Sequence, residues 1–419
     1  MSITQAGTDR VDRGAARLES AAQARAAAVR LAERFAVGAA ARDLDRRLPY
    51  AEIDELSTSG LLAITVPASF GGPDLAPSVV ADVTRITAAA DPNIAQIPHS
   101  HFVYLNLLRL AAPEELARRQ FGEVLRGGRV ANAQSEKGGK TIADISTTLT
   151  TVGTDRFRLD GEKFYATGSL FADTLAVLAR HPGDDALPAG EYIAFVPSDA
   201  PGVELVDDWN ALGQRTTGSG TVRFVDVAVG RGDLVIRADA VSRPTGYGAF
   251  AQLLHVAIDV GIARGALDEA VRFVNTSSRP WFEAGVDRAV DDELLVQRFG
   301  ELAVELITAE ATLAAAGRAL DRATGFLADD SGTEDSLRTV ADASIAVAAA
   351  KVVADRVSNE LGSALFEVSG TRSAAAVGGL DRFWRNARTH TLHDPVRWKI
   401  QHIGRHVLRN EDPPIHGVI

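Results

Sequence analysis

The chain has 419 residues, 46% of them apolar and 24% charged, which is typical of a soluble globular protein with two or three domain cores. Its 44 basic and 55 acidic residues give a net charge of −11, which disfavours broad contact with nucleic acid or an anionic membrane. The lack of cysteine excludes disulfides, thiolate metal sites and cysteine nucleophiles, and no HExxH-type pair at helical spacing predicts a metal site.

The first third of the chain has the composition and periodicity of helices. Residues 11–48 are rich in Ala, Arg, Glu and Leu, which predicts a helix with an exposed charged face. Pro49 is expected to open a short helix that ends at Gly60, and helical periodicity returns over residues 75–90 and 101–126. The N-terminus lacks the features of a signal peptide and no apolar run reaches the roughly 18 residues that cross a bilayer, so we expect a cytoplasmic protein.

After Gly127 and Gly128 the pattern changes to short segments rich in Val, Thr and Phe, separated by Gly, Pro, Asp and Asn. The predicted strands are residues 145–151, 156–159, 174–179, 191–196, 203–206 and 221–229. Six short strands at this spacing suggest a compact β-barrel or sandwich.

Long alanine-rich segments from 246 to 360 predict a helical bundle, with breaks near Pro280 and at the polar loop 329–336. The predicted domains are an N-terminal helical domain (1–127), a central β-domain (128–240) and a C-terminal helical bundle (241–419).

The stretch DRFWRNARTHTLHDP, residues 381–395, concentrates titratable side chains, among them His390 and His393. Such groups are costly to bury unless they are paired, so this stretch is expected at a ligand-lined surface. Histidine is the natural proton-transfer group because its ordinary pKa lies near working pH. The alternative is a solvated helix end whose Arg and His side chains offset the helix dipole.

Three motifs in this order resemble the acyl-CoA dehydrogenase fold over nearly the whole chain. They are Gly60-Leu61-Leu62 followed by Val66-Pro67 and Gly71-Gly72, the run GQRTTGSG at 213–220 before the strand TVRFVDVAV, and FEVSGTRSAAAVGGLDRFWRNAR at 366–388. The resemblance implies an α+β multidomain protein with an N-terminal helical domain, a central β-barrel and a C-terminal four-helix bundle. It also implies a flavin that the C-terminal segment meets across a subunit interface, in what is usually a homotetramer.

Within this superfamily, THTLHDP, ANAQSEKGGKTIAD and GEKFYATGSLFAD resemble flavin-dependent monooxygenases, the dibenzothiophene monooxygenase and sulfur-acquisition group. The resemblance implies reduced FMN supplied by a separate NAD(P)H-dependent flavin reductase, with FAD as the alternative cofactor. Oxygen then adds at the flavin C4a as a (hydro)peroxide, and one oxygen atom passes to a small organosulfur, amine or aromatic substrate. Two alternatives stay open: an FAD-dependent acyl-CoA dehydrogenase with Asp394 as its base, and a non-catalytic scaffold of the same fold.

The resemblance also assigns catalytic roles. His390 matches the position that protonates or holds the flavin peroxide, and His393 would orient it. Thr167 lies where a hydroxyl and a backbone N–H face flavin N5, and Asn132 lies on a strand that faces the flavin. The alternatives are a surface histidine that offsets a helix dipole and an ordinary turn threonine.

Further residues are candidates for holding the flavin. Arg279 and Arg372 would bind its phosphate bidentately, Arg279 from the same or from another subunit, with help from Ser369. The remaining candidates for contact with the flavin ring are Ser135, Trp209 and Asn386, with Gln134 as a weaker one. Each could instead be a surface salt bridge, a turn, a helix cap or a core side chain.

The candidate substrate-binding residues are His101, preferred over His99, and the aromatic residues Tyr104, Phe171 and Phe250, with Phe70 as a further guess. Packing in the core is the alternative for each of the aromatic residues.

Overall fold

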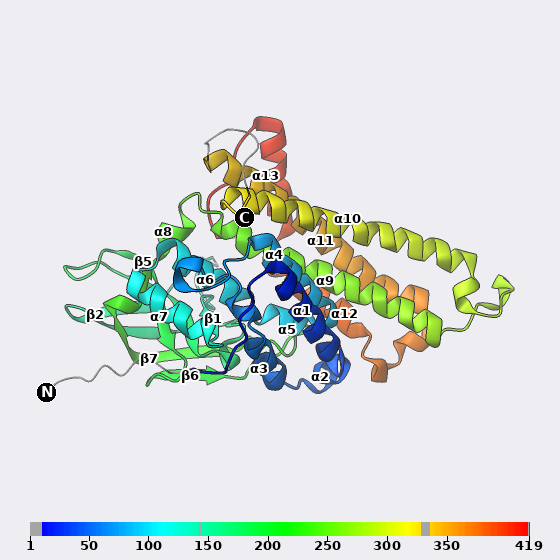
Figure 1. Ribbon diagram of the computed structural model, residues 1–419, viewed down its shortest axis with the longest axis horizontal. Coiled ribbons are helices and arrows are strands. Elements are labelled where there is room, and N and C mark those ends of the chain that lie inside the picture. The colour runs from blue at the N-terminus through cyan, green and yellow to red at the C-terminus, as the bar shows by residue number, and fades with distance from the viewer. Residues whose placement is uncertain (1–10, 142–143, 328–335, 418) are drawn as a thin grey trace.

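The computed structural model describes residues 11–141, 144–327, 336–417 and 419. The polar loop predicted at 329–336 therefore lies, up to residue 335, outside the described residues. The predicted order of helices, strands and helices is confirmed, with the sheet at one end of the molecule and three long helices reaching away from it (Figure 1).

Seven helices precede the sheet in the described chain: α1 (Ala21–Ala36), α2 (Ala39–Asp45), α3 (Tyr50–Thr58), α4 (Pro77–Ala90), α5 (Pro92–Gln96), α6 (His99–Ala111) and α7 (Glu114–Leu125). The single helix predicted over 11–48 is wrong at two places. Helix α1 begins only after Ser20, whose hydroxyl accepts a hydrogen bond from the N–H of Gln23 and so caps it. Gly38, with a φ of 80°, then separates α1 from α2 in a left-handed conformation that ends helices.

The middle of the chain forms one eight-stranded mixed sheet: β1 (Val130–Ala133), β2 (Thr148–Gly153), β3 (Arg156–Lys163), β4 (Thr174–His181), β5 (Gly190–Pro197), β6 (Val203–Val206), β7 (Thr221–Gly230) and β8 (Leu234–Ile236). The strands follow the order β6-β7-β3-β2-β4-β5-β8, and β1 pairs parallel to β4. Among the described strands, β6 and β8 end this path without pairing to each other, so the predicted barrel is an open sheet in its hydrogen bonding. The strand pattern did not predict β1 or β8, although the resemblance placed Asn132 on a strand at the position of β1.

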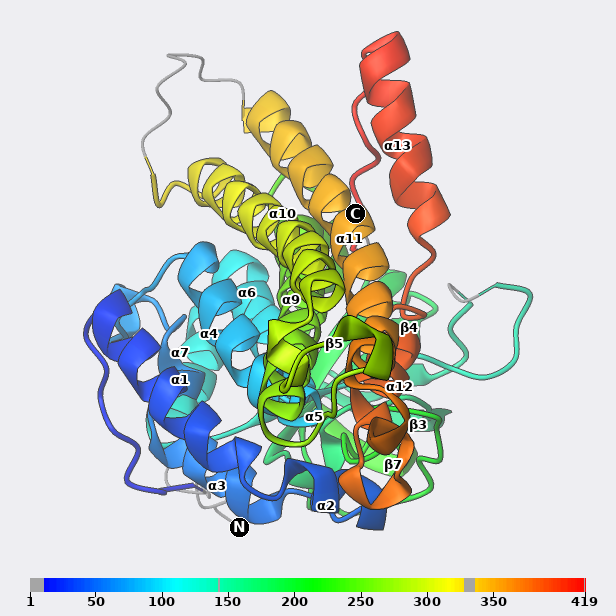
Figure 2. The same ribbon diagram turned by 90° about the vertical axis from the view of Figure 1, so that its right-hand side faces the viewer.

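Six helices follow the sheet: α8 (Arg237–Val241), α9 (Tyr247–Thr276), α10 (Glu293–Ala323), α11 (Ser336–Ser369), α12 (Asp381–His390) and α13 (Val396–Arg409). Helices α9, α10 and α11 run side by side, whereas α13 stands beside the end of α11 and projects from the molecule (Figure 2). Helix α9 is long and apolar enough to cross a bilayer, but 94% of its most apolar window is buried, so it is the central core helix.

The two helical parts share one hydrophobic core, which also takes in one face of the sheet through residues such as Leu178 and Phe195, while the other face of the sheet has a core of its own. Helix α4 lies against α9 at two glycines, Gly261 and Gly265. A Cβ added at these glycines would stand 2.6 Å from the carbonyl oxygen of Arg85 and 2.3 Å from that of Ala89. This close approach fixes the N-terminal helices on α9.

Candidate active site

The glycine-rich loop 213–220 is attached to α12. A Cβ added at Gly213 would stand 2.0 Å from the carbonyl oxygen of Arg385, so only glycine fits there. The backbone N–H of Gln214, whose φ is 51°, donates to Asn386 Oδ1 at 2.7 Å. These contacts join the loop from the sheet domain to the helix that carries His390.

Thr167 and Trp209 lie against the same loop. The hydroxyl of Thr167 is 2.8 Å from that of Ser219, and the N–H of Gly168 donates to the carbonyl of Thr217. The indole N–H of Trp209 donates to the loop carbonyl at position 214, at 2.7 Å. The structure therefore brings Thr167, Trp209 and Asn386 together around one loop.

Several buried polar atoms at this junction have no hydrogen-bond partner within the described chain. They are Asn386 Nδ2 and both side-chain amide atoms of Gln214, and Asn132 Oδ1 on β1 is a further buried atom without a partner. A buried polar atom without a partner costs about 1–3 kcal/mol, so a native protein retains such a group when a ligand satisfies it. Donors and acceptors of this kind fit the heteroatom edge of a flavin ring, so these residues are chemically suited to hold a flavin.

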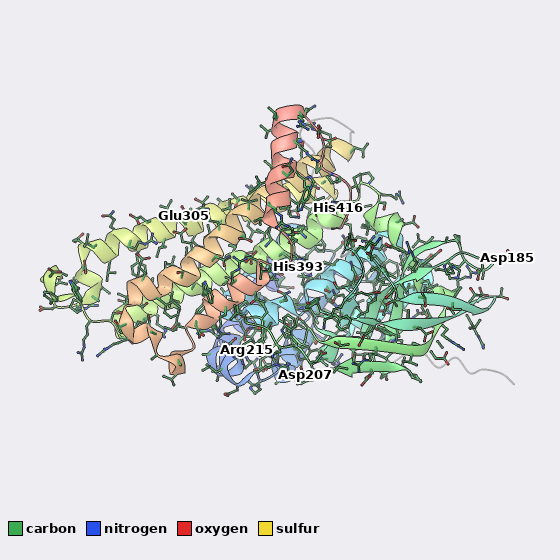
Figure 3. All side chains as sticks on the ribbon, turned by 180° about the vertical axis from the view of Figure 1, so that it is seen from behind. Asp185, Asp207, Arg215, Glu305, His393 and His416 are labelled. Atoms are coloured by element: carbon green, nitrogen blue, oxygen red, sulfur yellow. The ribbon has the colours of Figure 1, made fainter. Side chains whose placement is uncertain are left out.

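His390 lies one helical turn from Asn386 on the same face of α12. Its Nδ1–H donates to Asp259 Oδ1 at 2.6 Å, and its Nε2 is 3.0 Å from Nδ1 of His255. The ring of His255 lies 3.9 Å from that of His99 and 4.0 Å from that of His393, centre to centre. Figure 3 shows His393 where the long helices meet the rest of the molecule.

Two buried charged residues, Asp259 and Lys351, lie beside the histidine cluster formed by His99, His255, His390 and His393. Lys351 Nζ lies 2.7 Å from Asp259 Oδ2, and both side chains are fully buried. Burial raises the pKa of Asp259, but the charge of Lys351 and the hydrogen bond from His390 outweigh it, and the pKa falls below its ordinary value. Burial lowers the pKa of His390, which Asp259 opposes only in part. His390 is therefore a neutral imidazole whose tautomer is fixed by Asp259.

Asp394 is placed poorly for a general base. It lies 3.0 Å from Lys399 Nζ and 3.5 Å from His393 Nδ1. Burial raises the pKa of Asp394, but the hydrogen bond from His393 and the positive charges of Lys399 and Lys351 hold it well below its usual range. A carboxylate with so low a proton affinity does not favour the dehydrogenase alternative.

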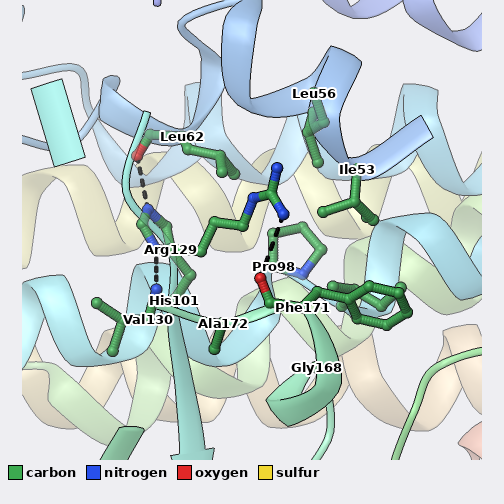
Figure 4. A pocket seen from close by; sticks show the side chains of 11 residues that line it. Ile53, Leu56, Leu62, Pro98, His101, Arg129, Val130, Gly168, Phe171 and Ala172 are labelled. Atoms are coloured by element: carbon green, nitrogen blue, oxygen red, sulfur yellow. Dashed lines mark hydrogen bonds between the residues drawn. The ribbon is translucent and has the colours of Figure 1, made fainter. Parts of the chain in front are cut away.

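Two predicted substrate residues, His101 and Phe171, line a cavity of only about 20 Å³ between α3, α6 and the sheet (Figure 4). His101 donates from Nε2–H to the carbonyl of Leu62 and accepts at Nδ1 from the N–H of Val130, and burial lowers its pKa to about 4. The cavity has room for about one water molecule. His101 thus joins the N-terminal helices to β1, and the substrate role remains a prediction without support from this geometry.

The other predicted residues lie in varied surroundings. The hydroxyl of Tyr104 donates to Gln134 Oε1 at 2.7 Å, and Phe250 is buried in the shared helical core. Ser135 is exposed, and its carbonyl accepts from the N–H of Phe164.

Arg279, Ser369 and Arg372 gather at the far end of α9. The Arg372 guanidinium donates to the carbonyl of Ser277, and the hydroxyl of Ser278 donates to the carbonyl of Ser369. From Asp259 to the end of α9 is about 25 Å along the helix axis, since each residue rises about 1.5 Å. Within one chain these three residues therefore do not join His390 and Thr167.

Sequence reasoning missed His255, Asp259, Lys351 and Gln214. A signal for the first two was present, because a histidine and an aspartate stand four residues apart inside the apolar run LLHVAIDVG. Polar residues at that spacing share one face of a helix that is otherwise hydrophobic.

The fold and this junction together define a flavoprotein of the acyl-CoA dehydrogenase type. Two family models agree: acyl-CoA dehydrogenase, middle domain, matches residues 131–227, and acyl-CoA dehydrogenase, C-terminal domain, matches residues 253–398.

Relatives with established names narrow this class. The chain is 33% identical to dibenzothiophene monooxygenase of Mycolicibacterium goodii over 376 residues, 87% of this chain and 88% of that protein. It is 31% identical to the probable FMNH2-dependent monooxygenase SfnC of Pseudomonas putida, over 91% of this chain and 94% of that protein. The crystal structure of FMN-bound TdsC from Paenibacillus sp. A11-2 superposes with a TM-score of 0.86 at 32% identity, covering 94% of this chain and all of that one. The chain belongs to the dibenzothiophene monooxygenase family of flavin-dependent monooxygenases, which confirms the predicted resemblance.

Proposed function

We propose that this protein is a two-component monooxygenase that uses reduced FMN and O2 to oxygenate a small organosulfur compound. The observation that carries the proposal is the set of unpaired buried amides at Asn132, Gln214 and Asn386, beside a neutral histidine, in a chain of this family. When bound, reduced FMN supplies two electrons, so that one atom of O2 enters the substrate and the other leaves as water.

The residues of the junction divide the work. Asn132, Gln214 and Asn386 hold the polar edge of the flavin ring through the atoms that have no partner within the described chain. Thr167 offers a hydroxyl beside the ring, and Trp209 offers an aromatic face. His390 is neutral and buried, and it belongs to the histidine cluster that takes up and returns a proton.

Reduced FMN comes from a separate NAD(P)H-dependent reductase. The relative SfnC is named an FMNH2-dependent monooxygenase, which supports delivery of the cofactor in its reduced form. This chain also has no GxGxxG motif after a predicted strand, the usual signature of a nicotinamide site.

The substrate class follows the relatives that are about 30% identical. They are named for dibenzothiophene and, in the crystal structure of MsuC from Pseudomonas fluorescens at 31% identity, for methanesulfinate. The amino sugar nitrososynthase RubN8 of Streptomyces rubradiris is 30% identical over only 57% of this chain, and the nitrososynthase of known structure from Micromonospora carbonacea is 22% identical and shares the fold alone. An organosulfur substrate is therefore favoured over an amine, and indole, which appears bound in a TdsC structure, serves as an aromatic comparison.

Arg279, Ser369 and Arg372 are assigned to the flavin phosphate of a neighbouring subunit in a homotetramer. Arg279 is exposed and makes no ion pair within the described chain, and Ser369 Oγ is buried without a partner there. Exposed apolar side chains on α10 and α13 give the subunits surfaces to bury. These side chains are Val304, Ile307, Val407 and Leu408.

The test supplies the purified protein with FMN, NADH, a flavin reductase and ¹⁸O₂, with dibenzothiophene, methanesulfinate or indole as the probe. One labelled oxygen atom in the product establishes oxygenation. Bleaching of bound FAD by an acyl-CoA under anaerobic conditions, with no labelled product, would establish dehydrogenation instead. Failure to bind FMN or FAD would point to the non-catalytic scaffold.

A matched pair of variants ties the activity to the junction. Asn386→Leu removes one amide from the loop contact, whereas Glu305→Gln changes a partly exposed residue on α10 that pairs with Arg356. The first should weaken FMN binding about tenfold, as expected for the loss of one or two buried hydrogen bonds, and the second should leave it unchanged.

A further inference from the structure

The most costly feature of the molecule that the proposed function does not explain is the ion pair between Asp259 and Lys351. Both side chains are completely buried, on α9 and α11. The free energy cost of removing two charges from water is offset only by close contact and further hydrogen bonds. A protein with an apolar pair of the same size would often be as stable. A role other than stability is therefore needed for this pair.

The hydrogen bonds of the pair have a direction. Asp259 accepts from Lys351 at one carboxylate oxygen and from His390 Nδ1–H at the other. With its proton on Nδ1, neutral His390 can only accept at Nε2, so His255 must donate from its own Nδ1–H, 3.0 Å away. His255 then carries its lone pair on Nε2. The order of donors runs from Lys351 at one end to His255 at the other.

We infer that Lys351, Asp259 and His390 are positioning residues that make His255 a proton-holding group of the active site, with Nε2 as the atom that takes and returns the proton. The inference rests on the proposed function and adds a residue to it. Balance is kept, because the two hydrogens of reduced FMN leave in the water molecule formed from one atom of O2, and His255 only stores one proton between its release and its return.

Lys351 determines whether His390 is neutral or charged. A buried carboxylate beside an imidazole ordinarily holds it as imidazolium. Lys351 satisfies that carboxylate, and the pKa of His390 stays below its ordinary value. When His255 takes a proton at Nε2, its Nδ1–H still donates to His390, whose Nδ1–H donates to Asp259. The added charge is thus stabilised through two hydrogen bonds, and the proton remains available.

Other charged groups surround the two histidines, on five elements and one loop. They are His99 on α6, Asp259 on α9, Lys351 and Asp355 on α11, Arg388 on α12, Lys399 on α13, and His393 and Asp394 in the loop between the last two helices. The positive groups lower the pKa of His255 further after burial has lowered it. For His255 and His390, the direct hydrogen bond to a carboxylate among the described residues is the one that His390 donates to Asp259.

The test is magic-angle-spinning ¹⁵N spectroscopy of the full-length protein without flavin, labelled at histidine, at pH 7. A His390→Gln difference spectrum assigns the signals. The expected result is one protonated and one unprotonated nitrogen for both histidines, with the proton on Nδ1 in each. A wild-type spectrum with the proton of His390 on Nε2 overturns the inference without any further variant.

Two variants test the roles of the charges. Lys351→Met should turn His390 into imidazolium at pH 7, and Asp259→Asn should mix the tautomers of both histidines. The control Asp321→Asn, a buried carboxyl on α10 that accepts from the N–H of Ser78, should leave the spectrum unchanged. Folded variants with the wild-type spectrum would show that the ion pair is only structural.

In the loaded enzyme, Lys351→Met should move the acidic limb of the rate profile to higher pH by about one unit, the usual effect of a nearby charge. An unchanged profile would contradict the inference. If the protein proves unable to oxygenate any probe, the spectra of the free protein still decide the tautomers, so this inference and the proposed function can fail separately.

Discussion

His101 is predicted to make the protein sensitive to mild acid. Its ring joins Leu62 on the N-terminal side to Val130 of β1 and must stay neutral, because Nδ1 accepts a hydrogen bond. The pKa of about 4 in the folded chain lies below the ordinary 6.5, so the unfolded chain binds a proton more readily. A group with a depressed folded pKa contributes stability above its unfolded pKa and loses it as the pH falls toward the folded value. The window therefore runs from about 6.5 down to about 4.

The magnitude follows from these two pKa values. Lowering the pH from 7 to 5 should remove about 1.8 kcal/mol of stability through His101 alone, and unfolding at pH 5 should take up about 0.9 proton at this site. His99, whose pKa burial lowers to about 3, and His255 add to the total in the wild type. The contribution of His101 is therefore read from the difference between the wild type and His101→Gln, since glutamine offers a donor and an acceptor but does not titrate.

The assay is urea unfolding at pH 7, 6 and 5, with proton uptake measured in weakly buffered solution. His101→Gln should show a shallower loss of stability with falling pH and should take up about 0.9 fewer protons at pH 5. The matched control is Phe102→Leu, which opens space in the neighbouring core and should lower stability equally at every pH. If His101→Gln keeps the wild-type dependence on pH, the neutral structural role of His101 is wrong.

Three further outcomes are expected. His390→Ala should leave folding and FMN binding largely intact while lowering the product formed per flavin oxidised, with the missing oxygen measured as hydrogen peroxide; full coupling in this variant would remove the role given to His390. Asn386→Ala should weaken FMN binding about tenfold in a fluorescence titration, since one loop contact and one flavin contact are lost, and an unchanged affinity would contradict the assignment. Gly213→Ala should lower the melting temperature and the flavin affinity together, because the added Cβ meets the backbone of α12. The control is Gly300→Ala inside α10, where an added Cβ meets nothing within 4 Å, so this variant should stabilise the folded protein by up to about 1 kcal/mol.

The sequence predicted the elements of the fold that depend on residues close together in the chain. Amphipathic periodicity predicted α4 and the three long helices, because the period of a helix is a property of neighbouring residues. The prediction extended the first helix too far, because an alanine-rich composition does not show where a helix begins or ends. Ser20 sets the start of α1, and Gly38 separates α1 from α2. Strand β1 is four residues long and pairs with β4 some forty residues later, so its existence depends on a partner that no window contains.

The site shows the same division. Asn386 and His390 share a helical face, which the sequence predicts from their spacing. The partners of His390 are on α9, about 130 residues earlier, and only the packing of α12 on α9 brings them together. The flavin-binding roles proposed for Arg279 and Arg372 require a neighbouring subunit, and no pattern within one sequence indicates which copy of the chain a residue serves.

The shared core of the two helical parts also sets an order of events during synthesis. Helix α4 finds its buried surface on α9, which starts about 120 residues after α7 ends. The first helices therefore leave the ribosome with an apolar face that nothing yet covers, while the face of the sheet that has a core of its own can close first. The N-terminal helices of this protein are therefore expected to complete their folding late in translation. The middle sheet is the part best able to form before α9 has been synthesised.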